Sequence, residues 1–411
     1  MAIGQALTVS RRGFLAPPSP VRKLMPLAVA AGARGIKVHH VNIGQPDIPA
    51  PIEMLEAIRG YSSSLLPYAP SRGMPETIAA WTDYYSIHGY GFSPEQIIVT
   101  TGGSEALWFA FMAVADHGDE IVVFEPTYAN YFGFASSAGI RPVGVPLDPA
   151  GGFHLPDLAT VEEHIGPATR AICIANPNNP TGTVYSAAEL GMLLELAERH
   201  NLFIITDETY RELVFDGARF ESIFHMAREA GREDHIIIAD SISKRFSATG
   251  ARIGCLATTN EEVMDAVGRF AQARLSAPTL DQLAAVPVLS NPIPYTDWLR
   301  GEYEKRRNVV FQCISEDARI RCRMPSGSFY IMVTLPIDDC DRFAAWLLTD
   351  FESEGETLMV APGSGFYLAP DAGLDQARLA FVLNEDDLAR AVTLLSEALD
   401  RYPMGPVAGH A

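Results

Sequence analysis

The stretch from Ser241 to Gly254 brings together a lysine, several hydroxyl groups and an arginine at spacings that could serve carbonyl chemistry. The apolar run 235–239 just before it predicts a buried strand. Lys244 is therefore expected just past the carboxyl end of a core strand, where open α/β sheets place their ligand crevice. Burial there should lower the pKa of the lysine, which makes its amine a nucleophile towards carbonyl groups. Ser241 and Arg252 supply a hydroxyl and a fixed cation suited to a phosphate. For this stretch alone, the alternative is an ordinary strand-end lysine beside a surface arginine.

Further candidates follow other apolar runs. Gly103 and Ser104 fall at a strand-to-helix turn, where the first amides of a helix can bind a phosphate, although Ser104 could be a plain helix cap. Asp207 ends an apolar strand and, once buried, needs a cation such as a protonated heteroaromatic nitrogen or a salt-bridge partner. The turn 176–182 carries several amide side chains and could equally be only a rigid turn. Arg378, inside an apolar strand, suits a bidentate anion or reaches to water at a sheet edge.

The elements that must position these residues alternate between strands and helices from about residue 95, which is typical of βαβ units with a parallel sheet. Residues 292–316 predict a polar connecting helix. Residues 318–400 predict an α+β unit with strands at 327–335 and 377–383. The core strands of the first part are predicted at 97–100, 120–124, 171–175, 202–206 and 235–239.

Length and composition narrow the functional classes. A chain of 411 residues predicts two domains with a sizeable core. A net charge of −19 argues against a nucleic-acid or anionic-membrane partner. The five cysteines lack the spacing of a disulfide framework or a zinc site, so we expect no metal and a reducing compartment. No apolar run reaches the roughly 18 residues of a membrane-spanning helix.

The N-terminal stretch 10–15, Ser-Arg-Arg-Gly-Phe-Leu, resembles a twin-arginine export signal. Such a signal continues into an uninterrupted apolar region, whereas prolines and basic residues occupy 17–23 here. We therefore expect a cytoplasmic protein, with export as the alternative.

Together, the order and spacing of these motifs resemble the fold type I pyridoxal-phosphate (PLP) enzymes, specifically the aspartate-aminotransferase-like class I/II aminotransferases, over about residues 41–402. The resemblance implies an α/β fold with a large PLP-binding domain, built on a mostly parallel seven-stranded sheet, and a smaller α+β domain. It implies an N-terminal arm and part of the small domain at 1–65, the large domain at 66–295 and the C-terminal small domain at 296–411.

The resemblance also implies residue roles. Lys244, Asp207 and Tyr210 correspond to the catalytic residues: the lysine that binds PLP covalently, the partner of the pyridinium nitrogen and the partner of the phenolic oxygen. The predicted cofactor-binding residues are Gly103, Ser104, Tyr128, Asn179, Asp207, Tyr210, Ser241, Lys244, Arg252 and Tyr68. Tyr68 resembles the tyrosine that reaches the phosphate of a neighbouring subunit, which implies a homodimer. The predicted substrate-binding residues are Gly44, Asn179 and Arg378.

The implied reaction is ping-pong transfer of an amino group from an L-α-amino acid, with aspartate as the default, to a 2-oxo acid such as 2-oxoglutarate. The same residues serve C–S β-lyases, cyclopropane-forming synthases, decarboxylases and oxidases of this fold, and a PLP-binding regulator without catalysis is a further alternative. No motif identifies the cation that dicarboxylate-specific members use for the distal carboxylate. Arg274 and Arg72 are candidates by neighbourhood, while Trp108 and Phe109 are expected in a helix core.

Overall fold

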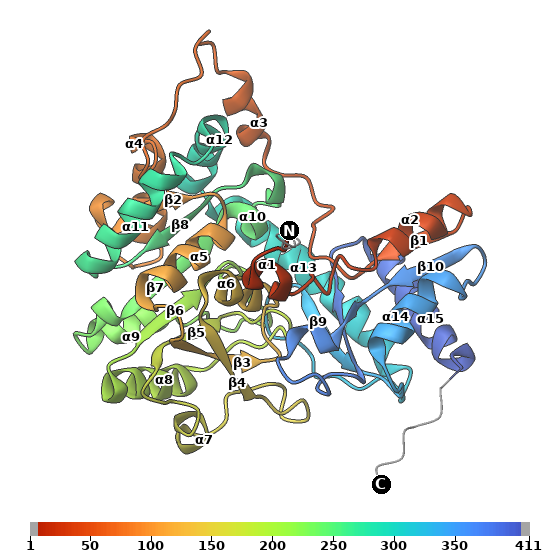
Figure 1. The fold of residues 1–411 in the computed structure, drawn as a ribbon. Coiled ribbons are helices and arrows are strands. Elements are labelled where there is room, and N and C mark those ends of the chain that lie inside the picture. The colour runs from red at the N-terminus through yellow and green to blue at the C-terminus, as the bar shows by residue number, and fades with distance from the viewer. Residues whose placement is uncertain (1–6, 404–411) are drawn as a thin grey trace, which may run out of the picture.

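A seven-stranded sheet forms the centre of the larger half of the molecule (Figure 1) in this computed structural model, which describes residues 7–403. Its strand order is β2-β8-β7-β6-β5-β3-β4. Only β8 runs antiparallel to its neighbours, so the predicted mostly parallel α/β sheet is confirmed. The strands are β2 (Ile97–Thr100), β3 (Glu120–Glu125), β4 (Arg141–Pro146), β5 (Thr169–Ala175), β6 (Phe203–Asp207), β7 (Ile236–Ser241) and β8 (Gly254–Ala257).

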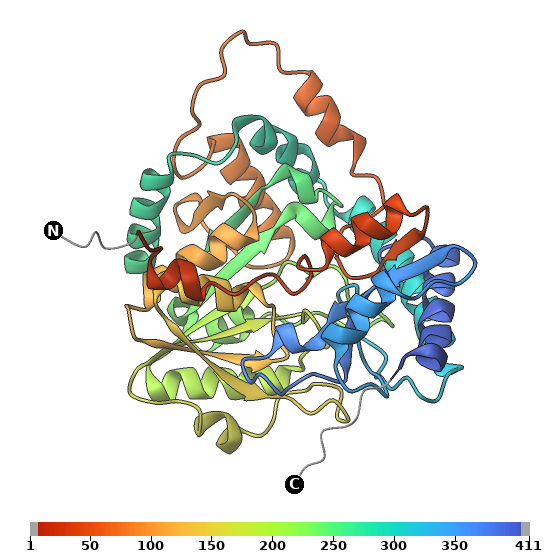
Figure 2. The ribbon, with the colours of Figure 1, turned by 45° about the vertical axis from the view of Figure 1, so that its right-hand side comes forward.

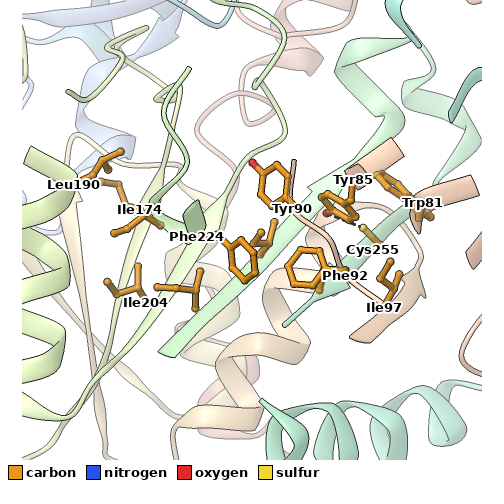
Figure 3. Close-up of a cluster of buried hydrophobic side chains, with 14 of the residues drawn as sticks. Trp81, Tyr85, Tyr90, Phe92, Ile97, Ile174, Leu190, Ile204, Phe224 and Cys255 are labelled. Carbon is orange, nitrogen blue, oxygen red and sulfur yellow. Dashed lines mark hydrogen bonds between the residues drawn. The ribbon is translucent and has the colours of Figure 1, made fainter. Parts of the chain in front are cut away.

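Successive side chains of the strands enter two different apolar cores, as the two-residue period of a strand requires. Along β7, Ile236 and Ile238 belong to one core, and Ile237 and Ala239 belong to the other. Figure 3 shows part of the first core, where Tyr90, Phe92 and Phe224 meet beside the isoleucines of β5 and β6. Both faces of the sheet are therefore buried, which explains why its strands read as continuous apolar runs.

Helices cover both faces. The main helical contributors of buried residues to the first core are α4 (Pro75–Ile87), α8 (Ala187–His200), α9 (Ile223–Glu229) and α12 (Thr279–Ser290). Those of the second core are α5 (Gly103–Val114), α6 (Asn130–Ala138) and α11 (Glu261–Arg274). Phe109 is buried in the second core as predicted, but Trp108 is 39% exposed, so the prediction of a core position was wrong for Trp108.

The smaller half contains the α+β unit predicted for the C-terminal part, and its core also takes Leu24, Ala28 and Val41 from the N-terminal part. An antiparallel sheet has the order β11-β12-β9, and a parallel pair joins β1 to β10. Its strands are β1 (Lys37–His40), β9 (Tyr330–Thr334), β10 (Glu356–Met359), β11 (Ala361–Pro362) and β12 (Gln376–Ala380). Its helices are α2 (Met25–Ala33), α13 (Ile293–Ser315), α14 (Cys340–Thr349) and α15 (Glu385–Arg401).

The N-terminal segment links the two halves. After α1 (Arg11–Leu15), which lies against α6, residues 16–24 cross the face of the molecule to α2 (Figure 2). Ser10 caps α1, so the twin-arginine motif forms the start of a short helix. The segment with α3 (Ile52–Arg59) and the loop after it projects from the body (Figure 1). No helix within residues 7–403 combines the length and apolarity needed to cross a membrane.

Two short helices complete the inventory, α7 (Leu158–Glu162) and α10 (Ile242–Arg245). The boundary predicted at residue 295 lies in the first turn of α13, and the proposed division of the chain into domains stays a prediction.

Candidate active site

Lys244 sits in α10, the single helical turn that follows β7. Its Nζ donates a hydrogen bond to the carbonyl oxygen of Gly44 at 2.6 Å. Burial lowers the pKa of Lys244 to about 7, and the positive charges of Arg378 and Arg252 act in the same direction. A substantial share of the amine at the end of the core strand, about half near pH 7, is therefore in its neutral, nucleophilic form.

Strand pairing brings the predicted phosphate ligands together. In the register of β7 and β8, Ser241 lies opposite Gly254, and in that of β2 and β8 Gly254 also lies opposite Thr100. Arg252 precedes β8 in a left-handed conformation (φ 51°). A Cβ on Gly102, which caps α5 with φ 74°, would overlap the Arg252 guanidinium. The arginine, the Ser241 hydroxyl and the first amides of α5 therefore converge on one small space, which is the geometry of an anion site.

Asp207, the last residue of β6, is a buried carboxylate without a cationic partner within residues 7–403. It accepts hydrogen bonds from the Thr209 amide at 3.2 Å and the Tyr131 hydroxyl at 3.3 Å. Burial raises the pKa of Asp207 above its ordinary value. A carboxylate in this setting is stabilised as an anion by a cation placed beside it.

Arg378, on β12, is held as a buried cation. It donates one hydrogen bond to Oδ1 of Asn179 at 2.9 Å and another to the Asn42 carbonyl at 2.6 Å, and its Nε finds no partner in the described part of the chain. Its guanidinium stacks over the ring of Tyr330, 4.1 Å from the ring centre. Five arginines are buried among residues 7–403, and Arg378 is the one without a carboxylate partner. It is therefore poised to take a carboxylate from outside the chain.

Tyr210 and Tyr330 connect these groups. The Tyr210 hydroxyl donates to the Tyr330 hydroxyl at 3.2 Å, and burial raises the pKa of Tyr210 well above its ordinary value. A Cβ on Gly44 would overlap the Tyr330 hydroxyl, so this backbone approach requires a glycine. Tyr128, from the loop after β3, accepts a hydrogen bond from the Asn130 amide at 2.6 Å, and burial raises its pKa to about 12.

One cavity of about 590 Å³ joins these groups, a size typical of a small-molecule site. All the predicted site residues except Tyr68 line it: Gly44, Gly103, Ser104, Tyr128, Asn179, Asp207, Tyr210, Ser241, Lys244, Arg252 and Arg378. Its charged lining residues make no ion pair with the described part of the chain, residues 7–403. The cavity thus presents uncommitted cations and one uncommitted carboxylate to a ligand.

Three residues considered in the sequence analysis, Tyr68, Arg274 and Arg72, lie outside this cavity. Tyr68 is 81% exposed and lines a separate hollow with Pro67 and residues 276–279, so its predicted role across a subunit interface stays a prediction. Neither cation suggested for the distal carboxylate lines the cavity of this chain. Arg274 pairs with Glu105 at 2.5 Å, and Arg72 donates to the carbonyl of Glu95.

A buried ionic cluster lies directly behind the site. Its members are the chain neighbours of the site residues: Glu208, Arg211, Asp240 and Arg245 adjoin Asp207, Tyr210, Ser241 and Lys244 in sequence. Arg211 donates to Glu208 at 2.7 Å and to Asp240 at 3.1 Å, and Arg245 pairs with Asp240. All these charged groups are buried. The cluster therefore joins the turn after β6 to the turn after β7.

Several residues that line the cavity were not predicted from the sequence. Tyr330, Ser243 and Thr209 lie beside predicted positions, and Arg22 comes from the N-terminal segment. Ser243 directly precedes Lys244 and Thr209 directly precedes Tyr210, and this adjacency was a usable signal. Nothing local distinguishes Tyr330 or Arg22, because the pairing of β9 with β12 and the course of the N-terminal segment bring them to the site.

Comparison with known proteins agrees with this geometry. The sequence model of the family described as aminotransferase class I and II matches residues 36–395. An aspartate/prephenate aminotransferase of Thermus thermophilus is 30% identical and covers 96% of this chain and 99% of its own. The structure of an aspartate aminotransferase from Thermus thermophilus with maleate has a TM-score of 0.85 at 29% identity, over 96% of this chain and 100% of the other. An alanine aminotransferase from Pyrococcus furiosus has a TM-score of 0.87 at 28% identity, over the same shares.

Proposed function

The chain belongs to the class I and II aminotransferases, PLP-dependent enzymes of fold type I, and on this premise we propose that it moves the amino group of an L-α-amino acid, with aspartate as the default donor, to a 2-oxo acid such as 2-oxoglutarate. The observation that carries the proposal is the single cavity lined by Lys244, Asp207, Arg252 and Arg378, none of which is ion-paired within residues 7–403. The names of the relatives support aspartate as the donor, although one structural neighbour is an alanine aminotransferase.

The lining residues fit PLP. The unpaired buried carboxylate of Asp207 suits a protonated pyridine nitrogen, and the Arg252 guanidinium, which packs directly on the Gly102 backbone beside the first amides of α5, suits a phosphate. We propose that Arg252, Ser241 and the Gly103–Ser104 amides hold the phosphate, that Tyr210 and Asn179 hold the phenolic oxygen and that Tyr128 packs on the ring. When bound, PLP supplies an electron sink that stabilises negative charge at the substrate Cα.

At the substrate, we propose separate roles for the side chains that bind it and for the one that moves its proton. Arg378 and Asn179 orient the α-carboxylate, and this fixes the direction of the Cα–H bond. The Nζ of Lys244 takes the proton from Cα, for which a pKa of about 7 is well matched to neutral pH. Asp207 keeps a proton on the heteroaromatic nitrogen by staying ionised beside it. The Gly44 carbonyl accepts a hydrogen bond from the Nζ of Lys244 at 2.6 Å and so helps to place the amine.

We also propose that the enzyme is a homodimer in which Tyr68 reaches the phosphate site of the partner subunit. The projecting segment carries the exposed side chains Leu65, Leu66 and Tyr68, which is a surface suited to burial against another chain. The predicted domain division at residues 65 and 295 and a cytoplasmic location complete the proposal. The five free cysteines are consistent with a reducing compartment.

The test is the visible absorbance of the purified holoenzyme while single amino acids are added. We expect aspartate to remove the cofactor band and 2-oxoglutarate to restore it, which establishes both half-reactions. Lys244→Ala should fold normally yet lose turnover by several orders of magnitude, as expected when a covalent and proton-transfer group is removed. Release of pyruvate and ammonia without recovery of the band would identify an eliminating enzyme instead, and near-normal transamination by Lys244→Ala would refute the assignment.

A further inference from the structure

Two arginines contact the turn that leads into α5, one inside the cavity and one outside it. Arg252 lines the cavity, donates to the Thr101 carbonyl at 3.5 Å and packs on the Gly102 backbone. Arg274, outside the cavity, donates to the Thr101 hydroxyl at 3.4 Å and pairs with Glu105 at 2.5 Å. Glu105 in turn accepts a hydrogen bond from the Thr101 amide at 2.8 Å. Thr101 is therefore held from the cavity and also by an ion pair that touches no cavity space.

Arg274 also holds the segments beside this turn. It is the last residue of α11, which packs against α5 and β2 (Figure 1). One terminal nitrogen donates to the Ser71 carbonyl at 3.0 Å and to the Val99 carbonyl at 3.3 Å, while the other serves Thr101 and Glu105. The guanidinium thus ties together the loop before α4, the end of β2 and the first turn of α5. Only the planar fork of an arginine offers donors in so many directions.

This ion pair differs from an ordinary surface salt bridge. The side chains of Arg274 and Glu105 are only 14% and 13% exposed, so water and salt screen their attraction weakly. The pair is therefore strong enough to fix the backbone that it contacts.

The shape of the turn matters because the proposed phosphate ligands include the backbone amides of Gly103 and Ser104. Backbone amides cannot change rotamer to follow a ligand, so their direction is set by the segment that carries them. A ligand site that is already in the bound geometry avoids the cost of ordering itself when the ligand arrives. The affinity for a phosphate should therefore depend on whatever holds residues 101–104 in place.

We propose that Arg274 is a positioning residue of the phosphate site, which acts with Glu105 to hold residues 101–104 so that the Gly103 and Ser104 amides face the cofactor phosphate. The inference rests on the proposed phosphate site. It assigns to Arg274 a function other than the distal-carboxylate contact considered from the sequence, and one that needs no contact with cofactor or substrate.

The first experiment titrates the cofactor-free protein with PLP and with pyridoxal, which lacks the phosphate, and follows the visible absorbance. Arg274→Gln should weaken PLP binding by about 10- to 100-fold, the range found when residues that support metal ligands are removed, and pyridoxal binding by less than about threefold. Arg274→Lys should recover part of the loss, because it keeps the charge beside Glu105 but not the fork. Arg269→Gln is the matched control, exposed on the same helix and without an ion pair within residues 7–403, and should leave both affinities unchanged.

The second variant, Glu105→Ala, separates positioning from simple charge. Removing a carboxylate near the site makes it more positive, which by charge alone should strengthen the binding of a phosphate. If the pair acts by holding the turn, Glu105→Ala should instead weaken PLP binding, and Arg274→Gln should add little in that background. In both single variants the phosphorus-31 NMR resonance of bound PLP should move towards that of free PLP, which reports the surroundings of the phosphate without any turnover.

Three results would overturn the positioning role: equal losses for PLP and pyridoxal in Arg274→Gln, a loss of the same size in Arg269→Gln, or tighter PLP binding by Glu105→Ala. A wild type that binds PLP no more tightly than pyridoxal would instead refute the proposed phosphate site itself. A wild-type preference for PLP that Arg274→Gln leaves intact would keep the phosphate site and remove Arg274 from it.

Discussion

Replacing Arg378 by methionine should separate binding from stability. Arg378 is 2% exposed, lies between the rings of Tyr330 and Phe366, and has no carboxylate partner within residues 7–403. A guanidinium buried in this way costs several kcal/mol of desolvation, which methionine avoids while filling a similar volume. The substitution therefore removes a charge that is useful only when a substrate carboxylate is present.

The opposing contributions nearly cancel in the free protein. Two hydrogen bonds from the guanidinium, to Asn179 and Asn42, contribute about 1.5–3 kcal/mol each, and the ring contact adds about 1–2 kcal/mol. Against this loss stands the avoided desolvation of several kcal/mol. The free energy of unfolding should change by no more than about 2 kcal/mol. A substrate carboxylate, by contrast, loses its buried partner, which costs about 3–5 kcal/mol and lowers kcat/KM by about 10²- to 10⁴-fold.

Denaturant titration and steady-state kinetics on the same preparations measure both quantities. Arg307→Met is the matched control, because Arg307 is equally buried but forms a two-point ion pair with Asp216 at 2.7 and 2.8 Å outside the cavity. That variant should lose about 1.5–3 kcal/mol of unfolding free energy and keep the kcat/KM of the folded enzyme.

Two results would refute this reasoning. If Arg378→Met lowered the unfolding free energy by more than about 4 kcal/mol, the guanidinium would be a structural element whose desolvation is already compensated. If kcat/KM for an α-amino acid stayed within about threefold of the wild-type value, Arg378 would not bind the substrate carboxylate.

Further predictions concern the amine, a glycine and the buried charges. The neutral fraction of Lys244 increases as the pH rises through its pKa of about 7. Reductive trapping of a small aldehyde by the cofactor-free protein should therefore show a midpoint near pH 7. A midpoint above about pH 9 would contradict the lowered pKa. Gly44→Ala should lower the free energy of unfolding by about 1–3 kcal/mol, because its Cβ would overlap the Tyr330 hydroxyl. The loss should be smaller in a Tyr330→Phe background, and equal losses in both backgrounds would exclude the clash with this hydroxyl. Arg211→Met should cost about 3–5 kcal/mol in denaturant titration because it removes a partner of two buried carboxylates, and a loss below about 1 kcal/mol would mean that the cluster is not stabilised by its ion pairs.

The parts of the site that could be predicted are those fixed by neighbours in sequence. Asp207 and Lys244 lie at or just past the ends of apolar runs that form β6 and β7. Parallel strands of an open α/β sheet have their carboxyl ends at the same edge, where the ligand crevice lies, so both residues could be placed there from the sequence. Arg252 is also local, because the β7–β8 pairing returns the chain to Ser241 after one turn.

The parts that could not be predicted depend on contacts between distant segments. Tyr330 reaches the site only because β9 pairs with β12 diagonally from Arg378. Strand β4 was missed because two prolines and a glycine interrupt it, which an edge strand paired only with β3 tolerates. Strand β8 was missed because its sequence, Gly-Cys-Leu-Ala, contains no β-branched or aromatic residue, whereas the equally short β2 consists of β-branched residues.

The ionic cluster behind the site has a consequence for motion. Arg211 pairs with Glu208 in the turn after β6 and with Asp240 near the end of β7, and Arg245 of α10 pairs with Asp240 as well. Neither the turn after β6 nor α10 can shift relative to β7 without separating buried charges, so the three move as one rigid body. Asp207 directly precedes the turn after β6, and Lys244 lies in α10. The distance between these two side chains is therefore fixed when the chain folds, before any substrate binds. Hydrogen exchange should accordingly be slow in 207–211 and 241–245.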